Sequence, residues 1–431
     1  MQLVAYGAQD IYLTGNPQIT FFKVVYRRHT NFAVESIEQT FNGTADFNKR
    51  VTATISRNGD LIQQMYLEVT LPTVTSGVAS TSNVWTYGVG NALVSQAEIE
   101  IGGQLIDRQY GDWMNIWTEL TIPSGKQDGY DNMVGNVITT GSTATNPAEQ
   151  LGGIAFSTTA TTRLYVPLQF WFNRNPGLAL PLIALQYHEV KLNLTIRAIA
   201  DLINVSVSPT AGNSLGCKLY VDYVYLDTDE RRRFAQVSHE YLIEQVQFTG
   251  TETIASGSSN KNVTLNFNHP VKELVWAHTT TAHATSGVAS HNCRWFNYSG
   301  LNTSGVDSFQ TALLQLNGHD RFSVRYADYF RKVQNYEHHT RVPRVGGDFG
   351  TRADTTTLAL RQFIYSYSFA LSPEEHQPSG TCNFSRIDNA VLQLTYNSAS
   401  ETAAALNLNI YAVNYNVLRI MSGMGGLAYS N

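Results

Sequence analysis

Cysteine and charge are both scarce in this chain of 431 residues. The three cysteines, Cys217, Cys293 and Cys382, are far apart and odd in number, so the sequence predicts no disulfide framework. Charged residues make up 15% of the chain and the formal net charge is −5, which excludes the basic surface that neutralises a phosphate backbone. We therefore expect no direct binding to nucleic acid.

Long apolar runs are missing as well. No stretch approaches the ~18 continuous apolar residues of a membrane-spanning helix. The first residues, MQLVAYGAQDIYLTGN, lack the basic region and apolar run of a signal peptide. The chain is therefore expected to be made in the cytoplasm and to be soluble.

Aromatic residues, by contrast, are plentiful, with 23 Tyr and 19 Phe among many Thr, Ser, Asn and Gly residues. This composition favours β-strands joined by turns, with few and short helices. Hydrophobic residues make up 43% of the chain, enough to fill the cores of the two or three domains that its length suggests.

Several segments occur twice in the same order. The segment ESIEQTFNG at 35–43 is echoed by LIEQVQFTG at 242–250, and TSGVAS at 75–80 recurs unchanged at 285–290. The segment IEIGGQLIDRQYGDW from Ile99 is similarly echoed by LQLNGHDRFSVRYADYF from Leu314. The order of these echoes indicates tandem copies of one β-unit.

The echo between Ile99 and Leu314 also predicts local structure. Gly102-Gly103 in one copy and Asn317-Gly318 in the other suit a two-residue hairpin turn, in which both central residues need positive φ. Short helical segments are expected after the two hairpins, at 111–120 and 326–334.

Later strands repeat too. Apolar residues alternate with others from Leu164 to Phe172 and again from Phe363 to Leu371, the period of a β-strand. Each copy contains about eight such runs, which favours an all-β fold of two tandem eight-stranded antiparallel jelly rolls, a double jelly roll with short helices in its loops. The expected division is an N-terminal arm and first jelly roll at 1–226, a solvated linker at 227–234, and a second jelly roll at 235–431.

Motifs for catalysis, metal binding and cofactor binding are not found. The adjacent His338 and His339 would point to opposite faces of a strand, and His278 and His283 are expected in a Thr-rich loop, so neither pair predicts a metal site. The glycine-rich segment SGMGG at 422–426 lacks phosphate-loop spacing and is expected to be a flexible tail that fits against a neighbour. We therefore predict no catalytic residue, no metal, no cofactor and no enzyme activity.

Two weak sites remain. Asn297 and Asn302 lie in glycosylation sequons within the loop NYSGLNTSG and are candidates for glycan attachment. Lys23, Arg27 and Arg28 lie in a basic and apolar segment, KVVYRRHT, and are candidates for a contact with minor proteins or membrane headgroups at an inner face. A solvated end of a strand or helix explains this second segment equally well.

Four long blocks carry a family resemblance: YGAQDIYLTGNPQITFFKVVYRRHTNFAVESIEQ at 6–39, NPGLALPLIALQYHEVKL at 175–192, QPSGTCNFSRIDNA at 377–390 and NYNVLRIMSGMGGLAY at 414–429. They resemble the major capsid protein of nucleocytoplasmic large DNA viruses, with the strongest likeness to the chlorella-infecting algal (phycodnavirus) branch. The resemblance covers nearly the whole chain. It leaves open whether this is the dominant capsid protein or a paralogous one.

The resemblance implies a structural glycoprotein of the virion. It further implies a homotrimeric, pseudo-hexagonal capsomer in the outer icosahedral capsid shell, with minor capsid proteins and an internal viral membrane beneath and covalent glycans on outward loops. The alternative is a secreted or surface tandem β-sandwich that binds glycans, against which the missing signal peptide and disulfides argue. A cupin-type enzyme is the third reading.

Overall fold

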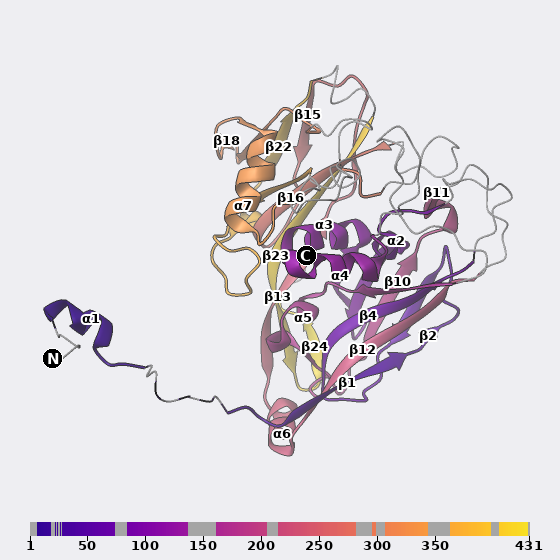
Figure 1. Ribbon diagram of the computed structural model, residues 1–431, viewed down its shortest axis with the longest axis vertical. Coiled ribbons are helices and arrows are strands. Elements are labelled where there is room, and N and C mark those ends of the chain that lie inside the picture. The colour runs from indigo at the N-terminus through magenta and orange to yellow at the C-terminus, as the bar shows by residue number, and fades with distance from the viewer. Residues whose placement is uncertain are drawn as a thin grey trace.

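The chain forms two β-sandwiches side by side, from which an N-terminal arm extends away (Figure 1). The structure, a computed structural model, describes residues 7–18, 22, 24, 26, 28–73, 84–136, 161–204, 214–281, 295–298, 307–343, 363–397 and 405–429. Both copies of TSGVAS lie outside the described residues.

The first sandwich consists of two antiparallel sheets. One sheet contains, in spatial order, β1 (Phe32–Gln39), β12 (Gly216–Leu226), β4 (Leu61–Leu71) and β8 (Thr162–Pro167), with β9 (Leu180–Pro181) also paired to β4. The other contains β2 (Phe41–Asn42), β3 (Arg50–Thr54), β10 (Val190–Ile196), β6 (Val94–Ile101) and β7 (Gln104–Tyr110). A small separate sheet pairs β5 (Val84–Trp85) with β11 (Ile203–Asn204).

The second sandwich is built in the same way. One sheet contains β13 (His239–Phe248), β23 (Leu406–Met421), β16 (Pro270–Thr280) and β20 (Ile364–Ser368), with the short strands β14 (Glu252–Ile254), β21 (Cys382–Asn383) and β24 (Met424–Leu427) at its sides. The other contains β15 (Asn260–Thr264), β22 (Ala390–Thr395), β17 (Thr311–Leu316) and β18 (His319–Asp320), with β19 (Arg325–Tyr326) also paired to β17.

The two sandwiches have one topology. If the eight principal strands of each are ranked along the chain, the sheet orders are first-eighth-third-sixth and second-seventh-fourth-fifth in both. This is the order of a jelly roll, in which the last strand returns to lie beside the first. The predicted double jelly roll is therefore confirmed, and the sandwiches are called the first roll and the second roll below.

The repeat extends to register and turn conformation. In the first roll Glu38 lies opposite Tyr220, and at the equivalent place in the second roll Glu244 lies opposite Tyr415. The predicted hairpin turns are also confirmed, since the four central residues all have positive φ: Gly102 (59°), Gly103 (84°), Asn317 (51°) and Gly318 (78°). Two pairs of different residues thus satisfy one backbone requirement.

The helices that were expected after these hairpins are present. The first is α3 (Gly111–Thr121), and its counterpart is the π-helix η6 (Tyr329–Val333) continued by α7 (Gln334–His338). The other helices are α4 (Ser124–Val134), α5 (Trp171–Arg174), α6 (Thr228–Gln236), η1 (Ala8–Asp10), α1 (Ile11–Thr14), α2 (Val89–Leu93), η3 (Pro176–Leu178), η4 (Ile199–Asp201) and η8 (Phe384–Arg386).

The strand expected from Leu164 to Phe172 was too long. It ends at Pro167, and Phe172 lies in the helical turn α5, which buries Trp171 and Phe172. Residues 124–134 form α4. The segment predicted as a solvated linker contains α6, which buries none of its residues and whose start is capped by the Asp227 carboxylate on the Thr228 backbone N–H.

Most buried apolar residues form one core that runs through both rolls, and Leu61, Ala179 and Val224 form a small separate cluster. Strand β4 shows how the sequence builds it. Alternate residues of this strand are buried while their neighbours are partly exposed; the buried ones are Met65, Leu67, Val69 and Leu71. Helices α2, α3 and α4 lie between the strands of the two rolls (Figure 1). The two rolls are therefore packed together and are not connected by the linker alone.

Close packing at the start of α3 gives a stability prediction. A Cβ atom on Gly111 would lie 2.2 Å from the Asn91 carbonyl oxygen and 2.3 Å from that of Val94. We expect Gly111→Ala to lower the free energy of unfolding by about 1–3 kcal/mol, because backbone atoms cannot move aside cheaply. Urea denaturation of both proteins measures the difference.

The matched control is Gly125→Ala in α4, where no atom lies within 4 Å of the added Cβ. This change should be neutral or stabilise the protein by up to about 1 kcal/mol, because alanine favours the helix. Equal effects of the two substitutions would contradict the packing described at α3.

Candidate functional site: the contact between the two jelly rolls

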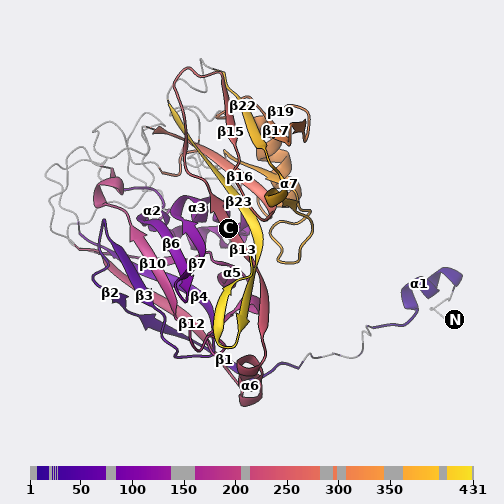
Figure 2. The ribbon, with the colours of Figure 1, turned by 180° about the vertical axis from the view of Figure 1, so that it is seen from behind.

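The two rolls are in direct contact with each other. The first roll contributes β7, α3 and α5, and the second contributes the outward face of its β13–β23 sheet. Both views show α3 and α5 beside β13 and β23 (Figures 1 and 2). In a structural protein a surface of this kind is the functional part, because it determines how the units are placed.

Aromatic rings form the centre of this contact. Tyr110, at the end of β7, lies with its ring centroid 5.0 Å from that of Phe248 and 6.3 Å from that of Tyr411 in the second roll. Trp113 of α3 lies 5.3 Å from Tyr411. Such edge and tilted contacts add about 0.5–1.5 kcal/mol per pair to the burial of the rings.

A carboxylate is buried beside these rings. Asp112 accepts hydrogen bonds from the hydroxyls of Tyr298 (2.8 Å) and Tyr411 (2.9 Å) and from the amide of Asn409 (3.1 Å), all in the second half of the chain. Burial raises the pKa of Asp112, and these three donors oppose that rise. A residue of α3 is thus held by donors that only the second roll supplies.

An ion cluster lies further along the same face. Glu244 of β13 contacts Arg174 of α5 at 3.1 Å and Lys272 of β16 at 2.8 Å. Burial opposes ionisation, but His376 and the charges of Lys272 and Arg174 outweigh it and lower the pKa of Glu244 to about 2. A β-bulge between Val271 and Glu273 lies at Lys272, and bulges commonly redirect a side chain in this way.

A second group of charges joins the helices of the two rolls. Arg341, which follows α7, pairs with Glu119 of α3, and burial raises the pKa of Glu119 to about 7. The ring of His339 lies 3.1 Å from Glu273 and 3.0 Å from Glu374. Burial alone would lower the pKa of His339, but these two carboxylates raise it to about 9.

The C-terminal hairpin fastens the second roll to the first. The Tyr187 N–H donates to the Gly423 carbonyl at 3.0 Å, and the Gly425 N–H donates to His188 Nδ1 at 3.1 Å. A Cβ atom on Gly425 would lie 2.6 Å from Leu185. The segment 422–426, expected to be a flexible tail, is therefore a packed turn and strand, because glycine lets its backbone approach the first roll closely.

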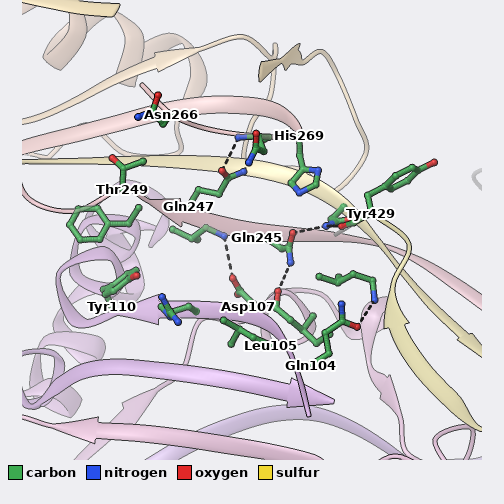
Figure 3. Close-up of a pocket in the computed structure, with 17 residues that line it drawn as sticks. Gln104, Leu105, Asp107, Tyr110, Gln245, Gln247, Thr249, Asn266, His269 and Tyr429 are labelled. Carbon is green, nitrogen blue, oxygen red and sulfur yellow. Dashed lines mark hydrogen bonds between the residues drawn. The ribbon is translucent and has the colours of Figure 1, made fainter. Parts of the chain in front are cut away.

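A polar groove of about 410 Å³ lies between β7 and β13 (Figure 3). Both are edge strands of their sheets, and side chains link them across the groove: the Val246 N–H donates to Asp107 at 3.2 Å, and the Gln245 amide donates to the Ile106 carbonyl. Burial raises the pKa of Asp107 to about 6. These links cover edge groups that would otherwise be open to pairing.

Of the predicted site residues, the structure describes Arg28 and Asn297. Lys23, Arg27 and Asn302 lie outside the described residues, and Arg28 is exposed on the arm. Asn297 is only 4% exposed, so its burial argues against the predicted glycan attachment there.

The expected loop position of His278 was wrong, since it is buried in β16, where burial lowers its pKa to about 3; His283 is not described. Among the described residues no group of three His, Cys, Asp or Glu side chains is placed to hold a metal ion, and no helix is long and apolar enough to cross a membrane.

The charged residues of this contact were missed by sequence reasoning. Arg174 and Glu244 are 70 positions apart, and neither belongs to a motif. One signal was available. The glutamate of the repeated Ile-Glu-Gln segment is present in both copies, as Glu38 and Glu244, and a strand with one solvated face does not require a glutamate at this position.

The contact of His339 with Glu273 and Glu374 predicts a dependence of stability on pH. The pKa of His339 in the folded protein, about 9, exceeds its ordinary value of 6.5, so its contribution is fully present below pH 6.5 and is lost as the pH rises through 9. We expect the free energy of unfolding to fall by on the order of 3 kcal/mol across this window. Urea denaturation at a series of pH values measures it.

The variant His339→Asn should be less stable at pH 6.5 and should lose most of this fall. His29→Asn, which changes an exposed histidine on the arm, should keep it. An unchanged pH profile in His339→Asn would contradict the assignment.

Two family models together match most of the chain. One, described as "Major capsid protein N-terminus", matches residues 20–227. The other, described as "Large eukaryotic DNA virus major capsid protein", matches 230–349 and 357–426. The major capsid protein of Pyramimonas orientalis virus is 53% identical, with 100% of this chain and 99% of the relative covered. That of Paramecium bursaria Chlorella virus 1 (PBCV-1) is 44% identical with the same coverage.

Solved structures agree with these relatives. The crystal structure of PBCV-1 VP54 matches with a TM-score of 0.74 and 40% identity over 96% of this chain and 100% of VP54. The Faustovirus major capsid protein matches with a TM-score of 0.71 at 13% identity, which shows the shared fold alone. The expected resemblance to the chlorella-infecting branch is confirmed, and the alternative of a glycan-binding β-sandwich gains no support. The chain belongs to the family of major capsid proteins of large eukaryotic DNA viruses.

Proposed function

We propose that this protein is a structural subunit of an icosahedral viral shell and that three copies form its building block, a pseudo-hexagonal capsomer. The observation that carries the proposal is the identical strand order of the two rolls. Three chains around a threefold axis then place six similar sandwiches in a ring, so that closed cyclic symmetry yields a nearly hexagonal tile. Hexagonal tiles cover the flat faces of a shell.

The geometry within one chain supports this arrangement. A ring of six lobes needs each lobe to contact two neighbours, and one chain already supplies one such contact, between its first and second rolls. That contact combines aromatic packing, buried hydrogen bonds and ion pairs. We further propose the division into an arm and first roll at 1–226, a connection at 227–234 and a second roll at 235–431, because in the described chain no strand of one roll pairs with a strand of the other.

The proposal includes partners beyond the chain itself. The subunit would be made in the host cytoplasm, would have no enzyme activity, and would lie in the outer shell of the virion above minor capsid proteins and an internal membrane. Glycans would attach covalently to outward loops. Of the two candidate asparagines Asn302 stays in this proposal, whereas the burial of Asn297 argues against it.

The oligomeric state is the direct test of the capsomer. We expect the purified protein at micromolar concentration to have three times the mass of one chain by light scattering. The reason is that subunit interfaces of obligate assemblies bury roughly 2,000–5,000 Å², which holds the copies together on dilution to this range. A purely monomeric species would contradict the proposal.

The arm gives a second test. Phe22, Val24 and Tyr26 are exposed beside the basic residues Lys23, Arg27 and Arg28, a combination that suits an anionic membrane surface. We expect the wild-type protein to sediment with vesicles that contain anionic lipid, and the variant with all three basic residues changed to Glu to lose most of this binding. Zwitterionic vesicles are the control, and equal binding of both proteins would remove the membrane from the list of partners.

A further inference from the structure

A second cavity lies between the two rolls, beside the buried Asp112. Its volume is about 220 Å³, well above the ~15 Å³ that a single water molecule requires. The first roll contributes residues of β6 and α3 and the residue that follows β10, and the second roll contributes residues of β16, β23 and the segment at Trp295. The cavity therefore exists only where the two rolls meet, and it has space for a small ligand.

One wall of this cavity carries an arginine with unused hydrogen-bond donors. The Arg197 Nε atom is buried, and no described residue accepts a hydrogen bond from it. Burial lowers the pKa of Arg197, and Asp112 opposes this through its charge alone. The oxygens of Asp112 already accept from Tyr298, Tyr411 and Asn409. A buried donor without an acceptor is costly, because it has lost its contact with water and gained nothing in return.

The Arg197 side chain is held in position before any ligand arrives. Its backbone N–H donates to the Leu93 carbonyl at 2.9 Å. Its Cζ atom lies 3.9 Å from the centroid of the Trp295 ring, and the Trp295 indole N–H donates to the Asp201 carbonyl at 2.7 Å. The N–H groups of a guanidinium lie in its own plane, so a ring that covers one side of it does not occupy them. They suit a carboxylate, which accepts two parallel hydrogen bonds from such a group.

The rest of the lining indicates which anion fits. The rings of Phe248 and Phe296 form an apolar part of the wall. Asp112 adds one buried negative charge, which repels a doubly charged anion more strongly than a singly charged one. The remaining polar side chains of the cavity are those of Ser95, Thr251, Thr279, Asn407 and Asn409. One negative charge, a planar oxyanion and a short apolar chain together describe a small monocarboxylic acid in its ionised form.

We propose that this cavity binds a small monocarboxylate, whose oxygens pair with the Arg197 guanidinium and whose apolar part contacts Phe248 and Phe296. The bound molecule touches both rolls and so strengthens the contact between them. Every residue of the site belongs to one chain, so the site does not depend on the proposed capsomer and can be tested whatever the oligomeric state.

Acetate is the simplest probe of this class. At neutral pH we expect saturation-transfer NMR on the whole protein to detect acetate binding with a dissociation constant on the order of 1 mM, as suits a ligand of few atoms held mainly by one charged pair. At about 100 mM sodium acetate the unfolding temperature should be about 2–3 °C higher than in sodium chloride of equal ionic strength, because only the folded protein binds the ligand.

Two cavity variants and one control make the test specific. Arg197→Gln removes the charged donors and should weaken acetate binding at least about 10-fold. Asn407→Asp has nearly the same shape and keeps an oxygen that accepts from the Thr281 hydroxyl at 3.4 Å, but it adds a negative charge to the wall and should weaken binding to a similar degree. Arg163→Gln changes a 63% exposed arginine side chain in β8 and should bind acetate as wild type does.

The deciding quantity is the change caused by acetate, which loss of the contact between Arg197 and Trp295 does not by itself imitate. A wild-type protein that binds no acetate would overturn the proposal and make the cavity a space for water. Equal acetate binding by wild type and Asn407→Asp would overturn it too, even if Arg197→Gln failed to fold. Tighter binding of sulfate than of acetate would overturn the assignment to a monocarboxylate.

Discussion

Covering the outward face of the β13–β23 sheet is the constraint on which the rest of the structure depends. This face carries Tyr411 together with the ionised Glu244, and a buried carboxylate is costly unless cations and donors meet it closely. Lys272 supplies one partner from the second roll, and Arg174 supplies the other only when the first roll is in place. The aromatic rings provide attraction, and the ion cluster fixes where the two rolls meet.

The strands and hairpins of this fold were predictable because local chemistry determines them. Glycine and asparagine at the turns, and the alternation along β4, specify a backbone or a buried side without reference to distant residues. The elements that the sequence did not predict also have a physical explanation. Phe172 belongs to a helical turn because tertiary burial outweighs its strand-like alternation, and α4 has the weak apolar pattern of a helix that buries little, chiefly Tyr130 and Val134.

The site was much less predictable than the fold. Duplication could be read from the sequence, but which face of each copy is covered depends on partners far away in the chain, such as Asp112 and Tyr411. Charged residues at such places look like ordinary surface residues until the sheets are assembled. The duplicated Glu38 and Glu244 show what the sequence does contain: one residue is present in both copies, but Glu38 pairs with Lys218 and Glu244 pairs with Arg174 and Lys272.

The C-terminal hairpin has a consequence for synthesis on the ribosome. Gly423 and Gly425 hold the first roll at Tyr187 and His188, so a segment translated after both rolls completes a surface formed by residues translated long before. Domains generally fold as they emerge from the ribosome, so the first roll folds while this surface is still exposed to solvent. A prematurely terminated polypeptide lacks the fastening altogether and keeps apolar side chains such as Leu185 accessible to chaperones. Only full-length chains therefore present a finished subunit for assembly.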